Sequence, residues 1–248
     1  MKLRGISSRS LSDIKPLQNW NVSNGNNFEE MFSYCKSLSD INPLQNWNVS
    51  NGNNFTAMFR NCKSLSDIRP LKNWDVSNWN IFASMFGECY SLSNIFPLKN
   101  WDVSNGKVFS GMFRRCIWLK TTTGLKNWNV SNGINFSGMF GQCIKLYDLE
   151  GIEKWDVSNG RNFRSMLFDC DISLDEIKLL EKWNFSNKKY YNDLFKDFLY
   201  PKSIVVKNPS SEKTESIESI SQNSISDSDG SVLEPPEITS KQIYNFNL

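Results

Sequence analysis

The sequence predicts an α/β solenoid of about seven stacked coils, followed by a disordered tail. Two observations support this fold class. Tryptophan and cysteine recur along most of the chain at a spacing of 27 residues, and such a period is typical of repeat proteins. After residue 200 both residue types cease and serine becomes frequent. We therefore expect a partial leading coil at residues 1–10, a solenoid at 11–200 and a disordered, serine-rich, acidic tail at 201–248.

The repeated unit reads W-[ND]-V-S-N-G-x-x-F-x-x-M-F-x-x-C-x-x-L-x-x-I-x-P-L-x-N. About nine of its 27 positions are apolar, too few to close a core within one unit, so neighbouring units must bury these side chains against each other. Residues repeated once per unit are therefore expected to be structural ladders. The tryptophan ladder comprises Trp20, Trp47, Trp74, Trp101, Trp128 and Trp155. The cysteine ladder comprises Cys35, Cys62, Cys89, Cys116, Cys143 and Cys170.

The first element of each unit is predicted to be a short helix. In the first unit, Phe28, Met31, Phe32 and Cys35 have the spacing i, i+3, i+4, i+7. This spacing is one face of a helix of about two turns. Asn27 precedes the run and suits the N-cap position of such a helix.

A strand-like stretch and a polar corner are expected to complete the unit. Leu38, Ile41 and Leu44 recur every third residue with Pro43 between them. This pattern fits a short extended segment that turns. The run 21–25 (Asn-Val-Ser-Asn-Gly) is typical of a turn, because Asn and Ser bond to nearby backbone and Gly permits positive φ.

The cysteine ladder could in principle support a different chemistry. Cysteines one strand spacing apart, about 4.8 Å, fall within the range that a disulfide or a shared metal needs. However, each lies among Phe and Met on the apolar face, and the chain has no His and no C-x-x-C pair. We expect reduced core thiols, and no metal, cofactor or catalytic residue. The absence of His also excludes the usual triads and general bases.

The repeated unit resembles that of a known family. The run 101–105 (Trp-Asp-Val-Ser-Asn), followed by Phe109, Met112, Phe113 and Cys116, resembles the BspA-like leucine-rich repeats, also called the mycoplasma lipoprotein-type repeat. The resemblance covers roughly residues 11–200. It implies a right-handed leucine-rich-repeat-type solenoid and a binding role. Similar arrays occur on bacterial surface proteins and in giant viruses.

Binding residues are sought among the positions that vary between units. Aromatic side chains flanked by arginine are typical interface anchors, whereas local packing between coils is the structural alternative. Such a set could also bind single-stranded nucleic acid. Residues 1–200 have only 24 basic against 19 acidic residues, which argues against nucleic acid. The candidate partner-binding residues are Trp79, Phe96, Trp118, Arg69, Tyr90, Arg114 and Arg115.

The sequence thus predicts a non-enzymatic protein-interaction scaffold with a protein partner. The alternatives are a surface adhesin that binds host or matrix components and, third, an enzyme. No signal peptide or membrane span is evident, so the expected location is the cytoplasm, or the host-cell cytoplasm or virion for a viral protein. Because the array starts within a unit, self-association through an open N-terminal coil is also expected as an option.

Overall fold

The computed structural model of the chain describes residues 10–199. The chain divides into two units, Met1–Asp197 and Phe198–Leu248. The expectations for residues 1–9 and for the tail at 201–248 lie outside the described residues. The elements are η1 (Lys15–Leu17), η2 (Asn42–Leu44), η3 (Arg69–Leu71), η4 (Phe96–Leu98), η5 (Thr123–Leu125), α1 (Leu174–Leu179), η6 (Leu180–Lys182) and α2 (Lys188–Leu199), where η denotes a 3₁₀ helix.

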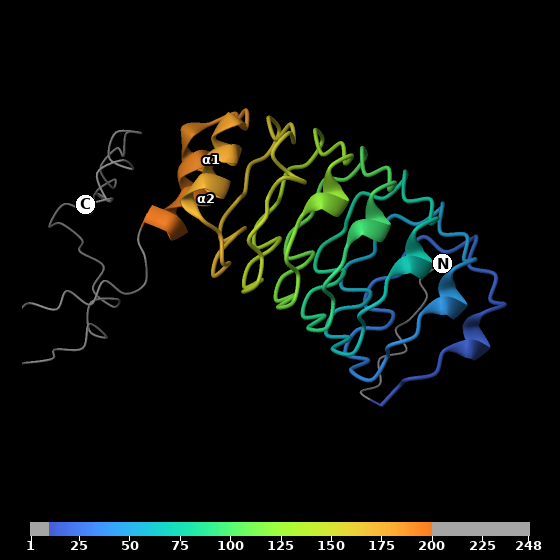
Figure 1. Cartoon of the computed structure of the whole chain (residues 1–248). Helices are drawn as coiled ribbons and strands as arrows, with labels where there is room; N and C mark the ends of the chain where they lie inside the picture. Colours follow the sequence, from blue (N-terminus) through green and yellow to red (C-terminus); the bar gives the residue numbers. More distant parts are fainter. Residues whose placement is uncertain (1–9, 200–248) are drawn as a thin grey trace, which may run out of the picture. The chain divides into compact units, whose positions relative to one another are not determined.

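Successive 27-residue segments lie side by side in chain order (Figure 1). We number them as coils, with coil 1 beginning at Trp20 and coil 7 at Trp183. Backbone hydrogen bonds join neighbouring coils; the Phe28 amide, for example, donates to the Asn54 carbonyl at 2.9 Å. Parallel one-residue bridges link Asn27, Asn54, Ile81, Val108, Asn135 and Asn162 in turn.

The helix predicted around residues 28–35 is not formed. Glu30 and Tyr34 have φ values of 56° and 63°, which a right-handed helix excludes. Instead, amide groups alternate between two acceptors: that of Met31 donates within a turn to Phe28, and that of Phe32 donates to Met58 of the next coil. Inter-coil pairing therefore replaces the helical ladder. The predicted set of core residues is nonetheless correct. The side chains that are buried here are those of Phe28, Met31, Phe32 and Cys35.

The predicted strand around Leu38, Ile41 and Leu44 is also wrong in part. The segment ends in η2, where the Leu44 amide donates to the Ile41 carbonyl at 3.0 Å. Pro43 fixes φ near the value that this turn needs and has no amide to pair with a neighbouring coil. The described residues contain only isolated bridges and no longer strand, so α/β is not an accurate description of their secondary structure.

The core is a set of ladders that run across the coils. Rings at equivalent positions stack, as in Phe82 and Phe109, with centroids 5.2 Å apart. The five ladder indoles from Trp47 to Trp155 each donate Nε1–H to a main-chain carbonyl 30 residues earlier, at 2.9–3.3 Å. These five side chains are at most 5% exposed. Trp20 differs, with a side chain that is 45% exposed.

Coils 4 and 5 approach each other closely on the 3₁₀ side of the stack, which is the side that carries η1 to η5. Gly124 and Gly151 occupy the position that holds Pro in earlier coils. A Cβ atom on Gly151 would lie 1.8 Å from the Thr122 carbonyl oxygen. The Gly151 amide donates to the Thr122 hydroxyl at 3.1 Å, and Thr122 itself is fully buried. Glycine is therefore required here for close backbone approach and for its N–H, which Pro lacks.

Coils 6 and 7 contain α-helices, α1 and α2, in addition to turns. Ser173 caps α1 by accepting a hydrogen bond from the Glu176 amide at 3.3 Å. Aromatic contacts then run from Phe163 through Phe185 to Tyr191 of α2. Through these contacts α2 packs against the end of the apolar core, where earlier coils have turns. Figure 1 shows α1 and α2, which belong to coils 6 and 7, side by side at the C-terminal end of the array.

Candidate functional site

The cysteine ladder contributes to the core and offers no reactive group. None of the six cysteines, all of which lie in the described residues, forms a disulfide. Five thiols donate to the carbonyl of a Phe in the preceding coil, for example Cys143 to Phe113 at 3.1 Å. Desolvation raises the pKa of these thiols and brings that of Cys170 to about 12. At neutral pH they remain protonated, and a protonated thiol is a poor nucleophile and metal ligand.

Thiol labelling tests this assignment. We expect the native protein at pH 8 to react with a disulfide reagent at less than about one thiol per chain on a time scale of minutes. The same reagent should count six thiols in denaturant. Cys170, which is the only one of the six that is not fully buried, should react first. Rapid native reaction of several thiols would contradict the packed ladder.

The repeated Asn and Asp residues also have structural partners. At the turn after each ladder tryptophan, Asn48 or Asp75 accepts bonds from the amide and hydroxyl of the Ser two residues later. The Ser104 hydroxyl and amide lower the pKa of Asp102 in the same way. Further along, the Asn105 side-chain amide donates to the Ser77 carbonyl at 2.8 Å and ties two coils together. The turn predicted at residues 21–25 is thus confirmed at the equivalent Asn48 and Asp75 positions.

Trp79 is not a surface residue, which corrects one of the candidates. Its side chain is fully buried and its Nε1–H donates to the Val49 carbonyl at 3.2 Å. The ring stacks on Phe55 and meets the edges of Trp74 and Trp101. Trp79 replaces a Gly of the repeat, so its indole fills space between two ladder tryptophans. It stabilises the stack and cannot contact a partner.

Trp118 lies at an exposed corner of coils 4 and 5. It is 53% exposed at the tip of a turn that the Leu119 amide closes on the Cys116 carbonyl. The segment 115–120 runs beside 141–147, since the Arg115 amide donates to Gly141 and the Tyr147 amide to Lys120. We define the Trp118 corner as Arg114, Arg115, Trp118, Ile144 and Tyr147.

The Trp118 corner combines apolar and cationic groups. Ile144 and Tyr147 are 47% and 52% exposed. Arg115 donates through Nε to the Gln142 side-chain oxygen at 2.8 Å, and Arg114 is exposed beside it. Tyr147 was not among the candidates predicted from the sequence. The available signal was that Tyr147 occupies a position where coils 1 to 3 have Ser and coil 4 has Lys.

The other predicted residues lie on different segments. Tyr90 is half-buried beneath the ammonium group of Lys63, 4.7 Å from its ring centroid. Arg69, at the start of η3, forms a 2.6 Å ion pair with Asp67. Phe96, at the start of η4, is 51% exposed. The structure thus groups Trp118 with the two arginines, and groups Arg69 with Phe96 elsewhere.

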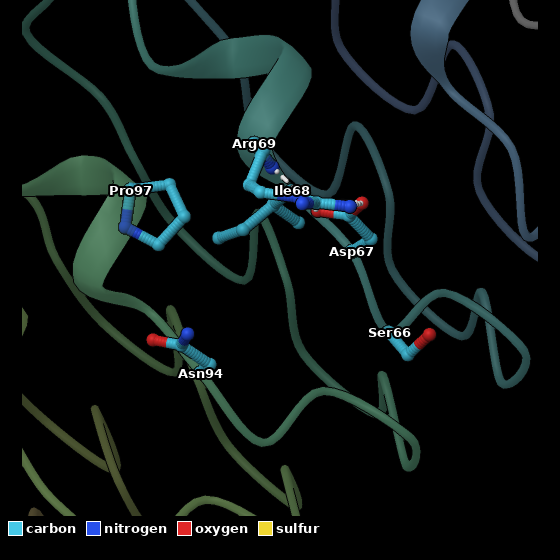
Figure 2. Close-up of a pocket in the computed structure, with 6 residues that line it drawn as sticks. All are labelled: Ser66, Asp67, Ile68, Arg69, Asn94 and Pro97. Atoms are coloured by element: carbon cyan, nitrogen blue, oxygen red, sulfur yellow. Dashed lines mark hydrogen bonds and ion pairs between the residues drawn. The ribbon is translucent and has the colours of Figure 1, made fainter.

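Arg69 and Phe96 border a shallow depression between coils 2 and 3. A cavity of about 260 Å³ is lined by residues of both coils. Figure 2 shows an adjoining part, where the Arg69 guanidinium lies over Asp67 while Asn94 and Pro97 come from the next coil. We define the lysine depression by the residues that line the cavity: Arg69, Lys72, Asn73, Asn94, Phe96, Pro97, Lys99 and Asn100.

Two further observations describe the chemistry of the chain between residues 10 and 199. No cluster of three or more His, Cys, Asp or Glu side chains in this range is arranged to hold a metal ion. In the same part of the chain, no helix has the length and apolar character needed to cross a bilayer.

Comparison with known proteins agrees with a repeat architecture. No curated protein matches the sequence. Residues 7–96 and 92–204 each match the family described as Mycoplasma protein of unknown function, DUF285. The two matches follow each other along the chain and together span the 27-residue repeats. The chain therefore belongs to this family of repeat-containing proteins.

Proposed function

We propose that the protein is a non-enzymatic protein-interaction scaffold, built as a right-handed solenoid of the BspA-like leucine-rich-repeat type. The contacts between equivalent residues of neighbouring coils support the solenoid. The repeated Trp, Cys and Asn side chains are occupied in holding coils together. Residues that depart from the repeat are left to bind a partner.

The Trp118 corner is the observation on which this proposal depends most. Three large apolar side chains, Trp118, Ile144 and Tyr147, are each about half exposed within two neighbouring coils. Exposing such a group to water is unfavourable unless a partner covers it. Tryptophan, tyrosine and arginine are also the residues most enriched at the energetic centres of interfaces. Because inter-coil hydrogen bonds hold the backbone in place, little order is lost on binding.

Affinity capture tests the proposal. The full chain would be immobilised and exposed to lysate of the cells that make it, beside the double variant Trp118→Ala, Tyr147→Ser. We expect a saturable partner whose affinity falls about thirtyfold in the variant, as for loss of one interface hot spot. Quantitative titration of the captured partner measures the change.

A matched variant controls for general loss of apolar surface. Ile134 is 39% exposed and lies at a position that holds Asn in coils 1 to 3, so Ile134→Asn should leave capture unchanged. Both variants should retain the circular dichroism and unfolding midpoint of the original protein. Capture that survives the double variant, or that is lost equally in Ile134→Asn, would contradict binding through the Trp118 corner.

A further inference from the structure

The 3₁₀ side of the stack holds a row of lysines. Lys72, Lys99 and Lys126 occupy the same position in coils 2, 3 and 4, immediately after η3, η4 and η5. All three are exposed. Like charges placed side by side on neighbouring segments repel each other and reduce stability. Contacts between the coils therefore do not explain why lysine recurs at this position.

Two of these lysines have no acidic partner in the described residues. Lys126 pairs with Glu150 at 3.2 Å. Lys99 has its ammonium 4.6 Å from the Phe96 ring centroid, and Lys72 forms no ion pair there. Asp67, the carboxylate that lines the adjoining cavity, is already held by Arg69. The positive charge of Lys72 and Lys99 is thus uncompensated.

The lysine depression places these charges beside groups suited to a peptide. Phe96 supplies an apolar surface that is 51% exposed. Asn73 and Asn100 line the same cavity, and each amide can both donate and accept hydrogen bonds, as a peptide backbone requires. A free phosphate dianion only accepts hydrogen bonds, whereas the backbone N–H groups of an extended peptide can also donate to the side-chain oxygens of these two Asn residues. The depression is open to solvent, which suits an extended segment.

We propose that the lysine depression binds an acidic segment of a protein partner. Carboxylates of that segment would lie against Lys72 and Lys99, and an apolar side chain would pack on Phe96. This proposal rests on the proposed scaffold function, and specifies the chemistry of one partner segment. It concerns a surface other than the Trp118 corner, because the two surfaces share no residue.

Binding of a labelled peptide tests the proposal. A fluorescein-labelled hexaglutamate peptide is titrated with the full chain and followed by fluorescence anisotropy at low and high salt. We expect saturable binding that weakens as salt rises. Lys72→Glu, Lys99→Glu should weaken it by at least about tenfold. Phe96→Ser should weaken binding of a peptide in which one glutamate is replaced by phenylalanine, and leave hexaglutamate binding nearly unchanged.

A matched charge reversal separates local from general electrostatics. Lys107 and Arg161 are exposed, belong to coils 4 and 6 and do not line the depression. Lys107→Glu, Arg161→Glu changes the net charge equally and should alter binding by less than about twofold. Equal loss in both double variants would overturn the proposal. No saturable binding to the original protein would also overturn it.

Two further outcomes would assign the depression to a different occupant. Displacement of the peptide by inorganic phosphate, with tighter binding of a phosphoserine peptide, would overturn the carboxylate assignment. A dimer in sedimentation that dissociates in Lys72→Glu, Lys99→Glu would assign the depression to a second copy and overturn the proposal as well. Peptide binding that persists in Trp118→Ala, Tyr147→Ser would support it. Because that variant tests capture at the Trp118 corner, the scaffold proposal and this one can fail separately.

Discussion

Replacing Gly151 with Ala is expected to lower the free energy of unfolding by about 3 kcal/mol, the upper range for inserting a methyl group into a packed interior. The new Cβ would lie 1.8 Å from the Thr122 carbonyl oxygen and 2.2 Å from its carbon. Neither atom belongs to a flexible side chain, so the backbones of coils 4 and 5 must separate. Separation would weaken the bond from the Gly151 amide to the Thr122 hydroxyl. Urea denaturation followed by circular dichroism measures the loss.

Gly138→Ala is the matched control. Gly138 has a φ of 59°, yet an added Cβ would meet no atom within 4 Å. The equivalent residue of coil 2, Ala57, already adopts a φ of 54°. The substitution should therefore change the free energy of unfolding by less than about 1 kcal/mol. Equal destabilisation by both substitutions would show that close approach of the coils is not what requires Gly151.

Trp79→Ala is expected to destabilise the protein by about 3–5 kcal/mol, because it leaves a large cavity. The indole is fully buried between Phe55 and two ladder tryptophans. The Val49 carbonyl would also lose the indole donor. Circular dichroism is the suitable probe of unfolding, since tryptophan fluorescence changes with the substitution itself.

Trp118→Ala controls for the loss of a tryptophan as such. Both residues lie outside the 27-residue tryptophan ladder, but Trp118 is 53% exposed. Its truncation should cost less than about 1 kcal/mol, as for surface substitutions in general. If Trp118→Ala proved as destabilising as Trp79→Ala, Trp118 would be a packing residue, and the Trp118 corner would no longer be a surface for a partner.

The contrast between these two tryptophans shows how far the candidate site could be predicted. The repeat identifies both as departures from the pattern, and from the sequence alone both appear as surface anchors. Trp79 replaces a Gly whose neighbourhood is filled by a Phe ring in other coils; in coil 4, a Cβ on Gly106 would be 2.5 Å from Phe109. The burial of Trp79 depends on the tryptophans of coils 3 and 4, which pack edge-on against its ring. No pattern within one unit contains that information.

The lysine depression could be predicted only in part, because it too is formed by two neighbouring coils. Arg69 and Phe96 were predicted, and the structure places them on the same cavity. Lys72 and Lys99 were not predicted, because a lysine that recurs in consecutive units resembles a solvated surface position. Their importance follows from the uncompensated charge beside Phe96, which requires knowing that Asp67 is held by Arg69.

By itself, the sequence determined the 27-residue period, and therefore which residues occupy the same position in successive coils. Residues that recur every 27 positions must meet their copies when coils stack, and this was enough to predict the buried Trp, Phe, Met and Cys positions. The tertiary structure decided the conformation between those positions. The amide of Phe32 bonds to Met58 of the next coil and not within a helix of its own. A local apolar spacing cannot distinguish these two acceptors, because only the neighbouring coil supplies the second one.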